Sequence, residues 1–193
     1  VVVLLSAQTW RQGRAYKNPE TLFLDTIRKN PGSWMVHYNL GHYFQQEKRF
    51  EEALSHYYIA QNLLPDNPDA ANNIGNILLD QGKPNAAVES FRKALAIKPD
   101  LAEAHYNLGV ALMALNRLPE AAHHLGVAIQ LDPGNARAHN NIGNVLARLG
   151  RPYQALPHYR EALRLDPGFD AARRNMGIVL RQIRTLPEDA APR

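Results

Sequence analysis

The sequence contains no cysteine, so disulfide bonds, thiolate metal sites and cysteine nucleophiles are excluded. It also has no phosphate-binding glycine loop, no nucleophilic serine turn and no His-Glu-x-x-His metal motif. The net charge is +4, but no basic run with interleaved aromatic residues occurs, which argues against nucleic-acid binding. These absences leave no candidate catalytic residue or cofactor, and they favour a non-enzymatic chain.

Glycine recurs on a fixed period. Five glycines lie 34 residues apart, at Gly41, Gly75, Gly109, Gly143 and Gly177. Alanine follows each of the first four glycines by 12 and by 19 residues, and proline follows by 24. A long fixed period of this kind is typical of a repeat array, in which each unit buries its apolar face against its neighbours.

Each period predicts two helices. Residues 69–81 and 84–98 carry apolar side chains at helical spacing. Gly82, Asn116 and Gly150 fall where first helices should end, because these residue types tolerate the left-handed conformation. Lys48 replaces them in the first unit, and Pro157 lies inside a second helix, which we expect it to kink or shorten.

The repeated pattern, as in Asn73-Ile74-Gly75 with Ala87, Phe91, Ala94 and Pro99, resembles the tetratricopeptide repeat (TPR) family. The resemblance implies an all-α fold, a right-handed solenoid of antiparallel helix pairs. The expected organisation is a half repeat (18–33), four repeats (34–67, 68–101, 102–135 and 136–169), a capping helix (170–185) and a tail (186–193).

The N-terminal segment, residues 1–17, has two interpretations. Val1–Leu5 are apolar, and Trp10, Arg11, Arg14 and Lys17 follow, an order found at the end of a membrane helix. The alternative is an ordinary helix that covers the first repeat. The basic residues favour a cytoplasmic location beside a membrane, whereas the resemblance described next favours a luminal or periplasmic one. A soluble cytoplasmic protein is the further alternative.

The junction after this segment has a resemblance of its own. The stretches 16–23, 30–34 and 37–41 are similar to a junction in multispanning glycosyltransferase-like proteins that carry a C-terminal TPR array, including transmembrane O-mannosyltransferases. The resemblance implies that chemistry belongs to a membrane portion absent from this chain. The chain would then be its non-catalytic appendage.

The sequence offers no convincing metal site among its eight histidines. His37, His105 and His139 share one column, four residues before a glycine, where the TPR family usually has a bulky aromatic residue. His105 and His139 are the nearest approach to a metal pair, but no third ligand has matching spacing. We therefore expect packing histidines and no metal.

The inner face of the first helices is the candidate binding site. In the TPR fold, side chains six, three and two residues before the glycine and one residue after it line a concave surface. Amides there can bond both the N–H and the C=O groups of an extended peptide. The predicted peptide-binding residues are Asn39, Asn73, Asn107, Asn141, Asn175, Tyr38, Asn72, Tyr106, Asn140, His42, Asn76, Asn144 and Arg137.

A related mode, the carboxylate clamp, fits less well. Asn76, Asn107 and Arg137 match it, but Asn72 and Asn141 replace two of its three cations. The sequence thus predicts a protein-interaction scaffold that binds a partner segment or peptide. The alternatives are a glycosyltransferase appendage with a membrane tether, and a self-associating scaffold whose end units stack.

Overall fold

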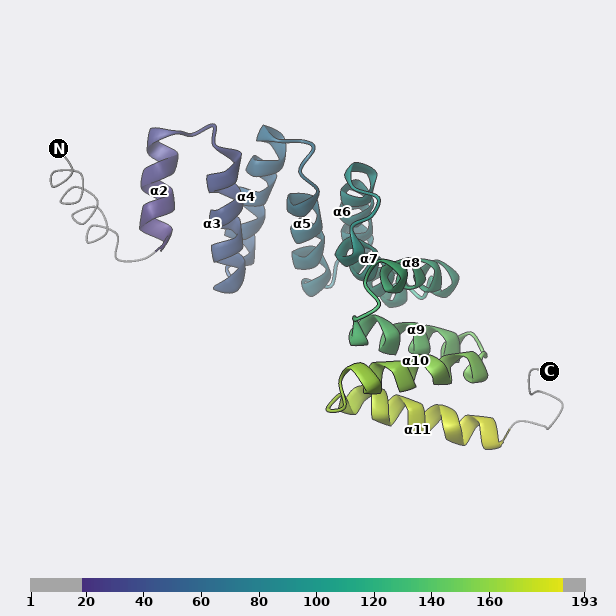
Figure 1. Ribbon diagram of the computed structural model, residues 1–193. Coiled ribbons are helices and arrows are strands. Elements are labelled where there is room, and N and C mark those ends of the chain that lie inside the picture. The colour runs from purple at the N-terminus through teal and green to yellow at the C-terminus, as the bar shows by residue number, and fades with distance from the viewer. Residues whose placement is uncertain (1–18, 186–193) are drawn as a thin grey trace. The chain divides into compact units, whose positions relative to one another are not determined.

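The computed structural model describes residues 19–185, and the predictions for residues 1–17 and for the tail 186–193 lie outside that range. Ten helices, α2–α11, make up the regular structure of the described residues, and no strand occurs among them (Figure 1). The chain divides into two compact units, one ending at Ile77 and one beginning at Leu78, and each is described by itself. Within the described range, no helix is both long and apolar enough to cross a bilayer.

The first unit contains α2 (Pro19–Lys29), α3 (Trp34–Gln46), α4 (Phe50–Leu63) and most of α5 (Pro68–Asp80). α3 packs on both α2 and α4. Arg49, which precedes α4, donates to Glu20 of α2 at 2.9 Å, and its guanidinium lies 4.2 Å from the ring centre of Phe44. This cation–π contact and the ion pair join α2 to the following helix pair.

The second unit contains α6 (Pro84–Ile97), α7 (Ala102–Ala114), α8 (Leu118–Leu131), α9 (Ala136–Arg148), α10 (Pro152–Leu165) and α11 (Asp170–Arg184). Successive helices from α6 to α11 pack on one another. α9 also contacts both α7 and α11, so the first helices of successive pairs form one layer.

The first helices end as the sequence predicts. Gly82, Asn116 and Gly150 adopt φ values of +71°, +58° and +73°. Lys48, the departure from the pattern, adopts the same conformation with φ of +59°. The residue directly after each of these four donates its N–H to the carbonyl oxygen five residues earlier, as Arg49 does to Phe44 at 2.8 Å. This is the Schellman arrangement.

Gly41, Gly109 and Gly143 of the periodic glycines lie where the two helices of a pair approach closely. A Cβ on Gly143 would lie 2.7 Å from a ring carbon of Tyr159, and one on Gly109 would lie 2.7 Å from Leu125. The alanine columns are buried as well; Ala121, Ala155 and Ala162 are fully shielded from solvent. Small residues at these positions therefore set the distance between the helices of a pair.

Of the two effects expected of Pro157, a kinked or a shortened helix, the shortening does not occur. α10 has 14 residues, the same length as α6 and α8. Proline lacks an N–H, so one helical hydrogen bond is lost, but the packing of Ala155, Tyr159 and Ala162 on neighbouring helices holds the turn.

Candidate binding face

Three of the asparagines two residues before the glycines, Asn73, Asn141 and Asn175, join adjacent first helices. In the first unit, Asn73 Nδ2 donates to Tyr38 Oη at 3.1 Å and to Tyr57 Oη at 3.3 Å. In the second unit, Asn141 Nδ2 donates to Tyr106 Oη at 3.3 Å. The bonds to Tyr38 and Tyr106 each span 35 residues, one more than the sequence period, so each joins a first helix to the preceding first helix.

Between α9 and α11, the acceptor is an asparagine amide instead of a tyrosine hydroxyl. Asn175 Nδ2 donates to Asn140 Oδ1 at 3.0 Å, and Asn140 Nδ2 donates to Asn141 Oδ1 at 3.2 Å. Asn140 is buried, as is Asn72 in the first unit. The bonded amides therefore have a structural role as cross-links between helices.

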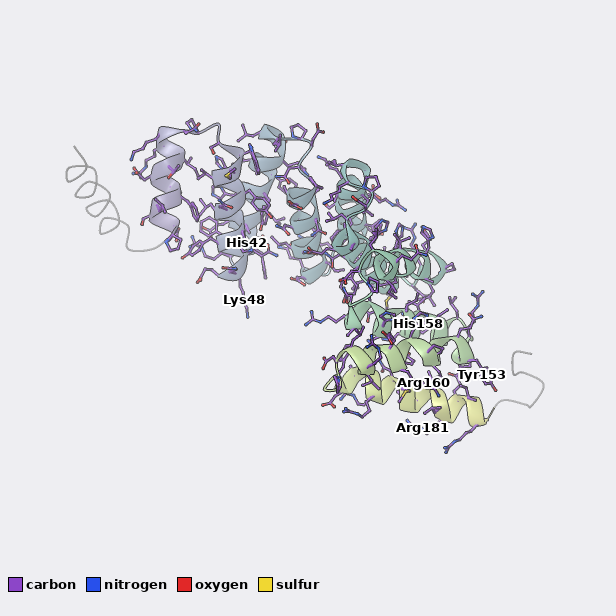
Figure 2. The ribbon with its side chains drawn as sticks, in the orientation of Figure 1. His42, Lys48, Tyr153, His158, Arg160 and Arg181 are labelled. Atoms are coloured by element: carbon purple, nitrogen blue, oxygen red, sulfur yellow. The ribbon has the colours of Figure 1, made fainter. Side chains whose placement is uncertain are left out.

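The other predicted site residues differ in how far they reach solvent. Asn39, His42 and Arg137 are exposed, and Figure 2 labels His42 on α3. Tyr38, Tyr106, Asn76, Asn107, Asn144 and Asn175 are partly exposed. Burial raises the pKa of Tyr106, although the hydrogen bond from Asn141 and the charge of Arg137 act in the opposite direction.

An open groove of about 310 Å³ lies on the layer formed by α7, α9 and α11. It brings together two of the predicted residues, Asn144 and Asn175, and adds apolar and polar side chains that sequence reasoning missed. The complete lining is Met113, Asn144, Ala147, Arg148, Tyr159, Asn175, Ile178, Val179 and Gln182.

Two polar contacts fix the groove wall. Tyr159 Oη donates to Asn144 Oδ1 at 2.9 Å, and Arg148 donates to Asn116 Oδ1 at 2.8 Å. Burial raises the pKa of Tyr159 to about 12, so this phenol stays a neutral donor. Ile178, in contrast, is 54% exposed, which is unusual for a large apolar side chain.

The groove has a cationic border. α9 and α11 together carry six arginines and a single acidic residue, Asp170. Arg173 is paired with Asp170. Arg173, Arg174 and Arg181 line a second hollow on α11 that also includes Ile178, and Figure 2 labels Arg181 on α11. The face therefore combines an exposed apolar centre with positive charge at its edge.

The histidines pack as expected, but against histidines that the sequence did not single out. His105 and His139 do not form a pair; each contacts a histidine of the second helix in its own repeat, His124 and His158. His37 contacts His56 in the same way. His37, His105 and His139 are buried, which confirms that they pack in the aromatic column.

Known families and structures agree with the repeat pattern. A "TPR repeat" family model matches residues 75–116 and 111–150, and a "Tetratricopeptide repeat" model matches residues 136–169. Protein O-mannosyl-transferase TMTC1 of Mus musculus is 30% identical over 83 residues, which are 43% of this chain and 9% of that protein. The matched region therefore spans about a tenth of the length of this curated relative.

Solved structures share the fold over most of the chain. YrrB, described as a TPR protein with an unusual peptide-binding site, is 25% identical with a TM-score of 0.75, and the match covers 84% of each chain. MamA is 27% identical with a TM-score of 0.70 over 75% of this chain and 84% of its own. Together with the 34-residue period and the paired helices, these matches show that residues 75–169 are tetratricopeptide repeats and that the chain has the TPR fold.

Proposed function

We propose that this chain is a non-enzymatic protein-interaction module whose first-helix face binds an extended segment of a partner protein. The observation that carries the proposal is the groove on α7, α9 and α11, in which an exposed apolar side chain lies beside amides and arginines. Apolar linings with a few placed polar groups are typical of binding sites.

The groove chemistry indicates what the partner segment contains. Ile178, Val179 and Met113 would receive an apolar side chain. Asn175 and Gln182 carry amide groups that can bond a peptide backbone. The arginines of α9 and α11 favour acidic residues on either side of the apolar anchor, because complementary charge speeds and orients association.

The test begins with a displayed library of random peptides selected against the 193-residue chain. Affinities of the selected peptides are then measured by fluorescence anisotropy for wild type and for Ile178→Glu. We expect the variant to lose roughly tenfold or more in peptide affinity. The reason is that the groove acquires a negative charge at its apolar centre, which also repels acidic peptides.

Arg160→Glu is the matched control, since Arg160 is exposed on α10 and is absent from the groove lining (Figure 2). It should leave affinity unchanged. Selected peptides that bind Ile178→Glu as tightly as wild type would refute the groove as the binding site, provided that circular dichroism shows intact helices.

A second proposal rests on the relative named as a protein O-mannosyl-transferase. We propose that the chain is the repeat region of a longer glycosyltransferase and that it engages the acceptor protein rather than the sugar donor. Deleting residues 34–169 from the parent protein should reduce transfer to a protein acceptor and spare hydrolysis of the sugar donor. Equal losses of both activities would contradict this assignment.

A further inference from the structure

Three histidine pairs recur at the same place in three repeats. The Nδ1 atoms of His37 and His56 are 2.9 Å apart, those of His105 and His124 are 3.0 Å apart, and those of His139 and His158 are 3.3 Å apart. Each pair spans 19 residues and joins the first helix of a repeat to its second helix. The arrangement is therefore a property of the repeat.

The rings meet through their nitrogens. The ring centroids of His105 and His124 are 5.2 Å apart, and their Nδ1 atoms are 3.0 Å apart. The difference is about the sum of the two centroid-to-nitrogen distances, so both Nδ1 atoms lie close to the line that joins the centroids. Each nitrogen therefore points toward the other, as in an N–H···N hydrogen bond. A zinc ion on that line would be too close to both, since Zn–N bonds are about 2.0–2.1 Å long.

The hydrogen-bond partners of His105 determine where the protons lie. His105 Nε2 is 2.9 Å from the carbonyl oxygen of Pro99, which can only accept, so this nitrogen carries a hydrogen. In neutral His105, Nδ1 is then an acceptor. His124 must then donate its Nδ1–H to His105 Nδ1, and this single hydrogen bond joins α7 to α8.

Proton counting shows what acid does to such a pair. A first added proton can go to Nε2 of His124 without disturbing the shared bond. A second must go to Nδ1 of His105, where two N–H groups would face each other 3.0 Å apart with two positive charges behind them. The doubly protonated pair is therefore incompatible with the packed helices.

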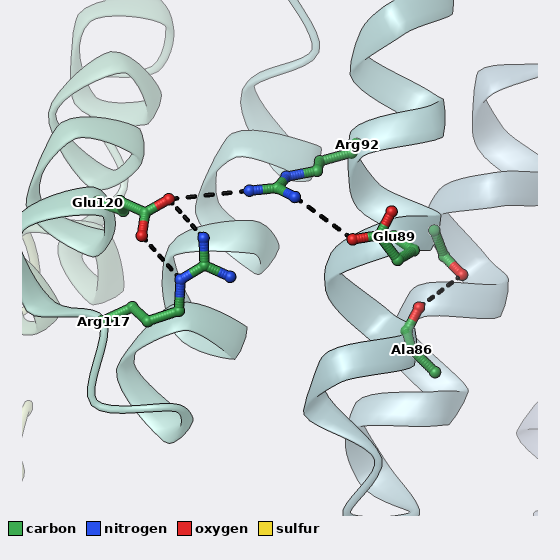
Figure 3. A network of polar contacts seen from close by, with 6 residues as sticks. Ala86, Glu89, Arg92, Arg117 and Glu120 are labelled. Atoms are coloured by element: carbon green, nitrogen blue, oxygen red, sulfur yellow. Dashed lines mark hydrogen bonds and ion pairs between the residues drawn. The ribbon is translucent and has the colours of Figure 1, made fainter.

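The charged surroundings do not relieve this conflict. Around His124, the opposing groups are His123 of the same helix and Arg92 of α6, and the favourable one is Glu120. Glu120 is already bound to Arg117 and lies 3.7 Å from Arg92, which also pairs with Glu89 (Figure 3). Burial, the paired His105, His123 and Arg92 lower the pKa of His124 to about 4, and Glu120 acts in the opposite direction.

The other two pairs have similar settings. Glu52 lies near His56 and is bound to Arg49, which also holds Glu20. Glu161 lies near His139 and is bound to Arg164. Burial and the paired histidine lower the pKa of His56 and of His158.

We propose that each histidine pair joins the two helices of its repeat through one shared N–H···N hydrogen bond. Acid opens the repeat array by adding a second proton to the pairs, which breaks these bonds. Above the ordinary pKa of histidine these hydrogen bonds are intact. Below it the unfolded chain binds protons that the folded pairs do not accept, so acid destabilises the scaffold at all three pairs.

The second repeat supplies a natural design for the test, because Ala71 and Ser90 occupy the equivalent positions there. The double variant His105→Ala/His124→Ser copies that pair into the third repeat. Urea unfolding of the 193-residue chain is measured across a pH series for wild type, for this variant and for His42→Ala, whose histidine is exposed and lies outside the three pairs.

For wild type, we expect the unfolding constant to rise steeply between about pH 6 and pH 5, where unfolded histidines are protonated. Removing one pair should lower the proton uptake on unfolding by about one to two protons. Each proton is about a tenfold change in the unfolding constant per pH unit. His42→Ala should keep the wild-type slope.

Imidazole nitrogen spectra of the folded wild-type chain give an independent readout. Near neutral pH they should show one histidine of each pair protonated on Nδ1 and its partner unprotonated there. The proposal is wrong if His56, His124 and His158 titrate in the folded state near the ordinary pKa of histidine, or if the variant retains the wild-type slope. If the variant does not fold, His139→Ala/His158→Ser and the wild-type spectra decide the question.

Discussion

At the residue scale, Lys48 shows how packing overrides sequence preference. Its φ of +59° belongs to a conformation that costs a non-glycine residue roughly 1–2 kcal/mol. Lysine carries no sequence signal for this conformation, whereas Gly82, Asn116 and Gly150 do. The helix nonetheless ends at the same place, because the next helix must turn back to bury Ala53 and Tyr57.

Replacing Lys48 with glycine should therefore raise the free energy of unfolding, by about 0.5–1 kcal/mol once the greater entropy of unfolded glycine is included. Urea denaturation measures this change. Lys98→Gly is the matched control, because Lys98 follows α6 with a φ of −131° and has no strain to relieve. A gain as large in the control would contradict the conformational explanation.

The histidine contacts mark the limit of residue-level prediction. The column that contains His37, His105 and His139 is visible in the sequence, and so are the histidines 19 residues later. The 19-residue spacing was the signal that could have found the pairs. Assigning the contact requires knowing that the two positions face each other across one helix pair, which periodicity within a single helix does not reveal.

At the element scale, the period groups together glycines with different roles. Gly143 on α9 packs against Tyr159, whereas a Cβ added to Gly177 on α11 would have as its nearest neighbour a guanidinium nitrogen of Arg181, 3.9 Å away. The sequence makes the two glycines equivalent. They differ because α11 has no following helix among the described residues.

Alanine at these two positions should act in opposite directions. Gly143→Ala should lower the free energy of unfolding by about 1–3 kcal/mol, because its Cβ would collide with Tyr159. Gly177→Ala should raise it by up to about 1 kcal/mol, since alanine is the better helix former. Thermal and urea unfolding measure both, and a loss at Gly177 similar to that at Gly143 would contradict the assigned contacts.

At the scale of the whole molecule, the sequence predicted the all-α repeat fold because the 34-residue period constrains many positions at once. The groove was only partly predictable. Asn144 and Asn175 belong to the expected inner face, but Met113, Arg148 and Gln182 lie at helix ends that the period does not mark. The hydrogen bonds between adjacent asparagines and tyrosines also depend on distances between repeats.

Alkaline pH should destabilise the molecule through its buried tyrosines. The pKa of Tyr159 is about 12 in the folded chain against 10.0 for the free side chain, and burial also raises that of Tyr57. The unfolded chain loses these protons first, so stability is full below pH 10.0 and falls as pH rises toward 12. Tyr159→Phe should show a shallower fall in urea unfolding, and an unchanged fall would contradict the assignment.

Binding of a partner segment along the groove formed by α7, α9 and α11 can be tested most directly by an amide-shift titration of the isotope-labelled chain with a library-selected peptide. We expect the largest shifts at Met113, Asn144, Asn175, Ile178 and Gln182. Shifts centred instead on exposed positions of the second helices, such as Arg160, would contradict it.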